Sequence, residues 1–169
     1  MLDIKGIRVA LFSGLSAYLG ITMIRKDQTG PAPAYPYGTG KATTPASANN
    51  GTWQRHDDGI DRMMVSSIWS LSFLSDDYDQ SVMLASRARE WITNSGHVWL
   101  SERGIAVQSV TNIANRDNIL TVDYENNHGF DVVLYVWDEK KPAEIASPAE
   151  MMETIEEVAI RSNLIIKEE

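Results

Sequence analysis

Apolar residues at the start of the chain recur with the spacing of one helix face, and a glycine follows at position 20. Such a stripe is typical of an amphipathic helix with one buried side, and glycine commonly ends a helix. The spacing therefore predicts a helix over residues 2–19, with a short strand, Ile21–Asp27, directly after it. The apolar positions of this helix are Ile4, Ile7, Leu11, Leu15 and Tyr18.

Apolar residues and serines alternate between residues 64 and 77, and a helical period then replaces the alternation. A period of two predicts a half-buried strand. The helix that follows is predicted over residues 75–96, with Ser75 and Asp76 as N-cap candidates and Gly96 as its end. The apolar positions are Trp69, Leu71 and Phe73 in the strand, and Val82, Leu84, Ala85, Ala88, Trp91 and Ile92 in the helix.

The second half of the chain has mostly the pattern of strands. Residues 105–114, 118–126 and 130–139 are each predicted as a strand, with a tight turn at "NNHG", where Gly129 would supply a positive backbone angle. Residues 154–160 are interpreted as an edge strand, although the capping box from Ser147 to Glu150 also suits the start of a helix. Together these strands predict an antiparallel meander.

These elements predict one domain, residues 1–169, of the α/β class in its α+β form. Two amphipathic helices would pack against a mostly antiparallel sheet. Apolar residues make up 43% of the 169 positions, which suffices for one hydrophobic core, and the chain is too short for us to expect two domains.

Residues 28–59, which we call the arm, show neither period and consist mainly of Pro, Gly, Ala, Ser, Thr and Asn. A structureless connection of this length is uncommon in a compact domain unless it has a function or is disordered. Within the arm, closely spaced prolines in "PAPAYPYGTGK", residues 31–41, favour an extended polyproline conformation, and Tyr35 and Tyr37 offer large amphipathic contact area. This segment either lies across a partner or covers the edge of its own sheet. Trp53, alone among polar neighbours, either folds back or docks into a neighbouring subunit.

The charge of the chain argues against a DNA-reading role. A net charge of -8 and a pI near 4.9 disfavour broad contact with phosphates, although an acidic surface suits DNA that passes without binding. The absence of cysteine excludes disulfides and thiolate chemistry and suits a reducing cytosol. No apolar run approaches the ~18 residues of a membrane span, so we expect a soluble protein with no membrane partner.

The pattern closest to an active site is "RHDDGID", residues 55–61, in which His56, Asp57 and Asp58 suggest a metal hydrolase. A polar turn is the stronger interpretation, since His97 and His128 lie in other segments and no second ligand cluster is visible. "GTGK", residues 38–41, lacks the first glycine and the Ser/Thr of a phosphate loop. The sequence therefore predicts no enzyme, no metal and no cofactor. Four tryptophans fall in or beside periodic segments and are interpreted as structural, namely Trp69, Trp91, Trp99 and Trp137.

With its N-terminal helix and the proline–tyrosine segment, the chain resembles the neck terminator family of tailed bacteriophages. "GFDVVLYV", residues 129–136, and "ETIEEVAI", residues 153–160, are similar to two further pieces of that family. The stretches 47–55 and 140–152 depart from its pattern. The individual residues that carry the resemblance are Ile24, Arg25, Gln28, Pro31, Pro33, Tyr35, Pro36, Tyr37 and Lys41.

The resemblance implies a ring-forming structural protein of the virion, most simply a hexamer, that caps the tail tube and joins it to a head-side connector or adaptor protein. The sheath protein is a further candidate partner, and DNA would cross the lumen without sequence-specific binding. The implied location is the virion neck, with the host cytoplasm before assembly. No enzymatic activity and no cofactor are implied.

A ring requires a heterologous interface, in which one patch of a subunit contacts a different patch of the next. The arm and the exposed strand edge at residues 154–160 are the two candidate interface segments. The alternative is a monomeric binding module whose proline–tyrosine segment is recognised by a partner domain. The candidate interface residues are Arg25, Pro33, Tyr35, Pro36, Tyr37, Lys41, Trp53, Ile155 and Val158.

Overall fold

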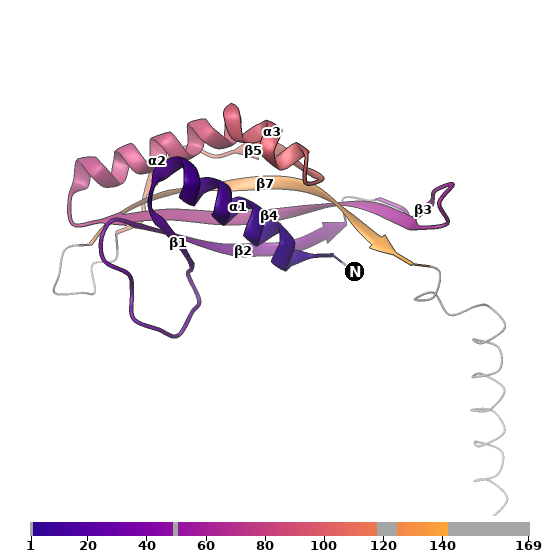
Figure 1. Cartoon of the computed structure of the whole chain (residues 1–169), viewed down its shortest axis with the longest axis horizontal. Coiled ribbons are helices and arrows are strands. Elements are labelled where there is room, and N and C mark those ends of the chain that lie inside the picture. Colours follow the sequence, from indigo (N-terminus) through magenta and orange to yellow (C-terminus); the bar gives the residue numbers. More distant parts are fainter. Residues whose placement is uncertain (1, 49–50, 118–124, 142–169) are drawn as a thin grey trace, which may run out of the picture. The chain divides into compact units, whose positions relative to one another are not determined.

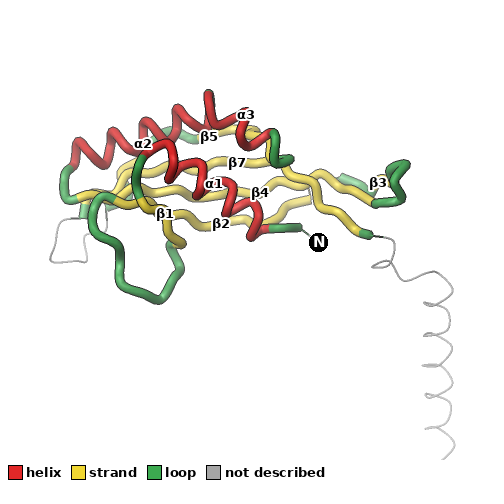
Figure 2. The backbone as a smooth tube through the Cα atoms, viewed as in Figure 1, coloured by secondary structure: helices red, strands yellow, loops and turns green. Residues whose placement is uncertain are grey.

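The computed structural model describes residues 2–48, 51–117 and 125–141 (Figure 1). The chain divides into two compact units, one of residues 1–52 and 63–138 and the other of residues 53–62 and 139–169. In the larger unit three helices cover one face of a mostly antiparallel sheet, which confirms the predicted α+β class (Figure 2). None of the helices in the described part has the length and apolar character needed to cross a membrane.

The first helix, α1 (Ile4–Leu19), confirms the helical pattern at the start of the chain. The carboxylate of Asp3 caps it by accepting a hydrogen bond from the backbone N–H of Gly6 at 2.7 Å. Gly20 ends the helix in the left-handed conformation, with φ of 71°, which a glycine adopts without strain. Strand β1 (Thr22–Arg25) follows at once, as predicted.

The strands of the sheet run in the order β1-β2-β4-β7-β5. The strand pairs are antiparallel wherever their register is defined, except that β1 runs parallel to β2. Two short strands lie off this order, since β3 pairs with β4 and β6 pairs with β7. The strands that follow β1 are β2 (Tyr37–Ala48), β3 (Gln54–Arg55), β4 (Asp61–Ser75), β5 (Ile105–Val110), β6 (Ala114–Asn115) and β7 (Asn126–Lys140).

Strand β2 corrects the prediction that residues 28–59 lack secondary structure. It begins inside the proline–tyrosine segment and pairs with β1 on one side and β4 on the other. Its glycines serve close packing: a Cβ at Gly40 would lie 2.5 Å from the Phe12 ring of α1, and a Cβ at Gly38 would overlap the Met23 side chain. Because glycine and proline usually indicate loops, the sequence of β2 does not predict a strand.

The second helix is α2 (Tyr78–Thr93), and the third, α3 (Ser95–Ser101), was not predicted. Asp77, rather than Ser75 or Asp76, is the N-cap of α2, and its side chain accepts a hydrogen bond from the backbone N–H of Gln80 at 3.1 Å. Gly96 does not end a helix. It lies within α3, and a Cβ there would overlap the Trp91 ring of α2, so the absent side chain makes room for the indole.

The predicted turn at residues 126–129 is wrong, because these residues are the first part of strand β7. Gly129 has no positive φ and pairs with Ala114 of β6. The single strand predicted over residues 105–114 is divided into β5 and the start of β6. The strand prediction for 118–126 falls largely, and that for 154–160 entirely, outside the described residues.

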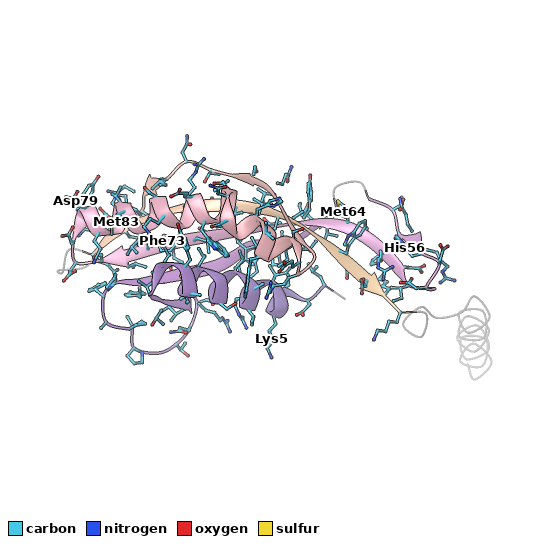
Figure 3. All side chains as sticks on the ribbon, turned by 45° about the horizontal axis from the view of Figure 1, so that its top comes forward. Lys5, His56, Met64, Phe73, Asp79 and Met83 are labelled. Carbon is cyan, nitrogen blue, oxygen red and sulfur yellow. The ribbon has the colours of Figure 1, made fainter. Side chains whose placement is uncertain are left out.

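The core lies between the helices and the sheet. Leu11 and Leu15 of α1, Trp69 and Phe73 of β4, and Phe130 of β7 are almost completely buried there. Asp79 and Met83 of α2 point away from this core, whereas Phe73 lies in the sheet layer (Figure 3). The alternation predicted for β4 therefore places its apolar side on the helices.

Candidate functional site

The tyrosines of the proline–tyrosine segment form a stacked pair at the start of β2. The ring centroids of Tyr35 and Tyr37 are 5.5 Å apart, with 20° between the ring planes. Both phenols donate a hydrogen bond to the same carboxylate oxygen, Glu125 Oε1, at 2.8 Å from Tyr35 and 3.0 Å from Tyr37. The peptide bond between Tyr35 and Pro36 is cis. One carboxylate thus holds both aromatic side chains.

Burial, together with the hydrogen bond to Glu125 and its negative charge, raises the pKa of Tyr37 well above the ordinary value of a phenol. Tyr37 therefore remains a neutral hydrogen-bond donor at any physiological pH. Its side chain is 5% exposed, so the chain itself covers it. In a single subunit Tyr37 therefore offers little surface to a partner, and its place in an interface stays a prediction.

Tyr35 differs from Tyr37 in its exposure, because 44% of its surface remains accessible. It ends the loop of residues 26–36, in which Pro31 is exposed and Pro33 and Pro36 are half-buried. The polar contact of Tyr35 with Glu125 and its stack on Tyr37 fix an aromatic ring whose outer side faces solvent. A rigid, exposed tyrosine is suited to contact with another protein.

Other predicted interface residues lie apart from this pair. Arg25 forms an ion pair with Asp27 at 2.9 Å, and the hydrogen bond from this guanidinium lowers the pKa of the Asp27 carboxyl. Lys41 is exposed on β2. Ile155 and Val158 lie outside the described residues.

Trp53 belongs to the smaller unit, where it is half-buried. The Lys140 Nζ atom lies 4.2 Å from the centroid of its ring, in a cation–π contact. Lys140 of the same unit thus covers one face of the Trp53 ring, and whether a neighbouring subunit contacts Trp53 stays a prediction.

The cluster "RHDDGID" forms the turn between β3 and β4. Arg55 pairs with Asp61 at 2.9 Å, and Arg62 pairs with Asp58 at 2.7 Å and with Glu139 at 2.7 Å. The hydrogen bond from Arg62 lowers the pKa of the Asp58 carboxyl. Two of the three carboxylates of the cluster are therefore bound by arginine. Across the described ranges, no group of three or more His, Cys, Asp or Glu residues is placed to hold a metal ion.

His128, predicted in a turn, is buried in β7. Its Nδ1 atom lies 2.9 Å from Ser81 Oγ, which also donates a hydrogen bond to the backbone oxygen of Phe73 at 2.9 Å. Since the hydroxyl has one proton, His128 Nδ1–H is the donor to Ser81. The edge of the ring meets Tyr78 at 4.9 Å between centroids. This arrangement connects α2 to the sheet.

On the face of the sheet opposite the helices, one arginine side chain forms hydrogen bonds to two strands. Arg116 Nη2 donates to Asp131 Oδ1 of β7 at 2.9 Å, and Arg116 Nη1 donates to Ser70 Oγ of β4 at 2.6 Å. The same nitrogen lies within reach of the Leu71 backbone oxygen at 3.3 Å and of Ser72 Oγ at 3.4 Å. This guanidinium joins the two central strands. Sequence reasoning missed it, because neither the spacing nor the period of the chain relates residue 116 to residue 70.

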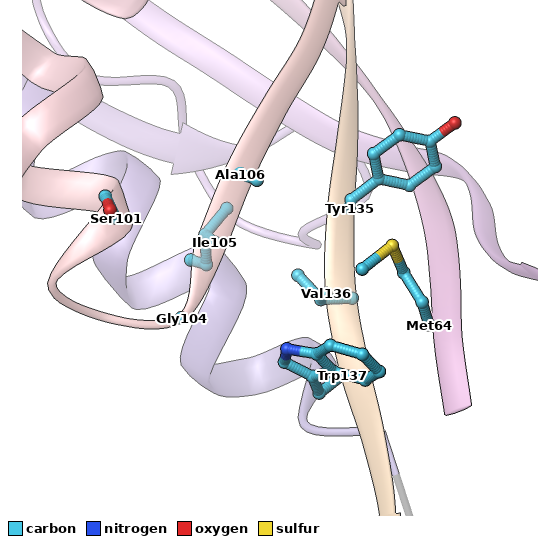
Figure 4. A pocket seen from close by; sticks show the side chains of 8 residues that line it. All are labelled: Met64, Ser101, Gly104, Ile105, Ala106, Tyr135, Val136 and Trp137. Atoms are coloured by element: carbon cyan, nitrogen blue, oxygen red, sulfur yellow. The ribbon is translucent and has the colours of Figure 1, made fainter. Parts of the chain in front are cut away.

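An open cleft of about 200 Å³ lies farther along the larger unit, at the start of β5 (Figure 4). Ile105 and Ala106 of β5, Tyr135 and Trp137 of β7 and Met64 of β4 line it. Met64 is 43% exposed and Trp137 is 44% exposed. Sequence reasoning assigned Trp137 a structural role and did not find this exposed apolar surface.

Comparison with known proteins gives one family. The model of the family described as "Phage neck terminator protein" matches residues 9–168. No curated protein matches the sequence significantly.

Proposed function

The chain belongs to the phage neck terminator family, and from this premise we propose that its subunits assemble into a ring, most simply a hexamer. The ring caps the tail tube and joins it to the head-side connector, with a channel left for DNA. The family assignment places the protein in the neck of the virion as a structural component.

The observation that best supports assembly is the fixed, exposed ring of Tyr35. An interface side chain that is already held in place loses little conformational entropy when a partner covers it. Glu125 and Tyr37 hold Tyr35 in this way, at 2.8 Å and at 5.5 Å between ring centroids. Pro33, which is half-buried, lies two residues before Tyr35 in the loop of residues 26–36. We therefore place one side of the subunit interface on Tyr35 and Pro33.

The charge of the chain supports a channel through which DNA slides. At a net charge of -8 per subunit, a ring of identical subunits repels phosphates rather than holding them. A protein that gripped DNA at this place would oppose its passage.

Replacing Tyr35 by serine tests the interface. If Tyr35 is an interface hot spot worth ~2 kcal/mol, Tyr35→Ser raises the protein concentration needed for assembly roughly 30-fold. Tyr18→Ser is the matched control, because Tyr18 of α1 is 38% exposed and Tyr35 is 44% exposed. Native mass spectrometry, alone and with tail-tube or connector protein, gives the readout. Equal assembly of both variants would remove Tyr35 from the interface.

A point substitution tests the interface more specifically than a deletion of the proline–tyrosine segment, because the deletion would also disturb the sheet. A deletion of residues 30–41 would remove the start of β2, which pairs with β1 and β4. The alternative function, a monomeric module whose proline–tyrosine segment is bound by a partner domain, rests on the same exposed Tyr35. It predicts a wild-type chain that stays monomeric with every virion protein, and Tyr35→Ser would then abolish only the binding of its partner.

A further inference from the structure

The two edges of the sheet differ in how well they are protected. At one edge, β1 pairs only with Tyr37–Gly40 of β2. Among the described residues, Lys41–Ala48 of β2 therefore pairs with β4 on one side and with no strand on the other. This stretch holds an exposed lysine, Lys41, the proline Pro45, and two register shifts against β4. Lysine, proline and irregular register are the means by which natural sheets prevent pairing with a further strand.

The opposite edge is β5, and it lacks most of this protection. Its six residues contain neither lysine nor proline, and its only irregularity is the register shift at Gln108. Ala106, Gln108 and Ser109 are exposed. Within the described part of the chain, no strand other than β7 pairs with β5. Backbone groups along an edge of this kind are a template for an added strand.

The cleft at the start of β5 has a shape that suits such an addition. Ala106 pairs with Tyr135 of β7, so a methyl group on β5 stands beside a large aromatic ring on the next strand (Figure 4). The missing side-chain volume at Ala106 contributes to the cleft of about 200 Å³. A branched apolar side chain on an added strand would cross over Ala106 and contact Tyr135 and Met64.

The charges around β5 favour an acidic segment. β5 itself carries no charge, and arginines stand at both of its ends. Arg103 precedes Ile105 and is 38% exposed, with Glu102 at 3.8 Å, and Arg89 donates to the Thr111 backbone oxygen at 3.0 Å just beyond Val110. The last 28 residues of the chain, 142–169, contain seven acidic and two basic residues.

We propose that the free edge of β5 and its cleft bind residues 154–160 of a second copy of this chain as an added strand, with Val158 or Ile160 in the cleft. This proposal rests on the proposed ring, and it names the surface that receives the C-terminal segment. Twelve residues, 142–153, separate this segment from the end of the described chain, and they span up to ~40 Å when extended. That reach is comparable with the width of a typical domain. The three glutamates Glu153, Glu156 and Glu157 complement the two arginines in charge.

Because the chain has no cysteine, crosslinking between introduced cysteines tests the proposal in the full-length protein. The variant Gln108→Cys/Ala159→Cys, which keeps both Val158 and Ile160, is treated with a short bismaleimide and is expected to give a ladder of covalent multimers on a denaturing gel. A mixture of the two single variants is expected to give a dimer only. The matched control is Ala46→Cys/Ala159→Cys, which carries its first cysteine on the protected edge of β2, and we expect no ladder from it.

A second variant tests the cleft itself. Ala106 is exposed, so Ala106→Phe fills the cleft without entering the core. In the background of the two cysteines we expect it to reduce the ladder at least tenfold while the circular dichroism spectrum stays unchanged. An unaltered ladder would remove the cleft from the interface.

Three results would overturn the inference. They are a crosslink confined to monomers, an equal ladder from the Ala46 control, and no crosslink in a preparation that native mass spectrometry shows to be ringed. The last result leaves the proposed ring intact. A chain that stays monomeric with tail-tube and connector protein overturns the ring as well, so the two failures are distinguishable.

Discussion

Gly129 of β7 packs tightly against the backbone of β4, and Gly129→Ala measures what this contact contributes. A Cβ on Gly129 would overlap the backbone oxygen of Leu71 and lie 3.0 Å from the Cα atom of Ser72. Both atoms belong to the backbone of β4, so no side-chain rotation relieves the contact. The strands must separate by several tenths of an ångström where Arg116 joins them.

The size of the effect follows from two opposing contributions. Overpacking of this kind costs about 1–3 kcal/mol, and we take the upper value because backbone meets backbone. Replacing glycine by alanine restricts the unfolded chain and returns about 0.4–1 kcal/mol. The net loss of unfolding free energy is then about 2 kcal/mol. For a chain of this size, that loss lowers Tm by roughly 4–8 °C.

Differential scanning calorimetry of Gly129→Ala measures this change, with Gly30→Ala as the matched control. Gly30 has no atom within 4 Å of a Cβ and no positive φ, so the same substitution there should leave Tm unchanged or raise it slightly. A Gly129→Ala protein with the Tm of its control would refute the reasoning. It would mean that the two strands separate freely and that Arg116 does not hold them together.

Three further predictions concern single contacts. Because the folded state raises the pKa of Tyr37, the unfolded state loses this proton first as the pH rises above the ordinary value of about 10, and stability should fall by up to ~1.4 kcal/mol per pH unit. Urea midpoints at pH 9 and pH 11 should therefore differ less in Tyr37→Phe than in the wild type, and parallel pH profiles would contradict the assignment. Arg116→Met should remove about 2 kcal/mol, because it abolishes charge-assisted hydrogen bonds to two strands, and a change below about 0.5 kcal/mol would show that water replaces them. Arg62→Ala should speed amide exchange at Gln54 and Arg55 without a measurable change in Tm, since its ion pairs are exposed, and unchanged exchange would show that these pairs do not hold the turn.

The long, strongly periodic segments of this fold could be predicted from the sequence. The helix stripe from Ile4, the serine alternation around Trp69 and the stripe of α2 each persist for several turns or pairs, and each element lies where its pattern placed it. Periodicity records which side of an element is buried, and burial is what these segments share. Their termini were less certain, since the cap of α2 is Asp77.

Periodicity could not predict the elements in which glycine makes room for a neighbouring side chain. Gly38 and Gly40 admit Met23 and Phe12 into the sheet, and Gly96 admits Trp91, yet in the sequence all three look like loops or stops. In the candidate interface Tyr35 is exposed and Tyr37 is buried, a difference that the sequence did not predict. The Tyr37 hydroxyl donates its hydrogen bond to Glu125, which lies 88 residues away along the chain, so local patterns do not reveal this contact.

The protected edge of β2 also affects how unassembled subunits behave in solution. An exposed, unprotected sheet edge is a template for pairing with another molecule and a route to aggregation. Two molecules whose β2 edges approach each other at Pro45 cannot pair there, because proline lacks the backbone N–H that the strand pair requires. Pro45 therefore disfavours edge-to-edge association through β2, which leaves unassembled subunits free to form their specific contacts.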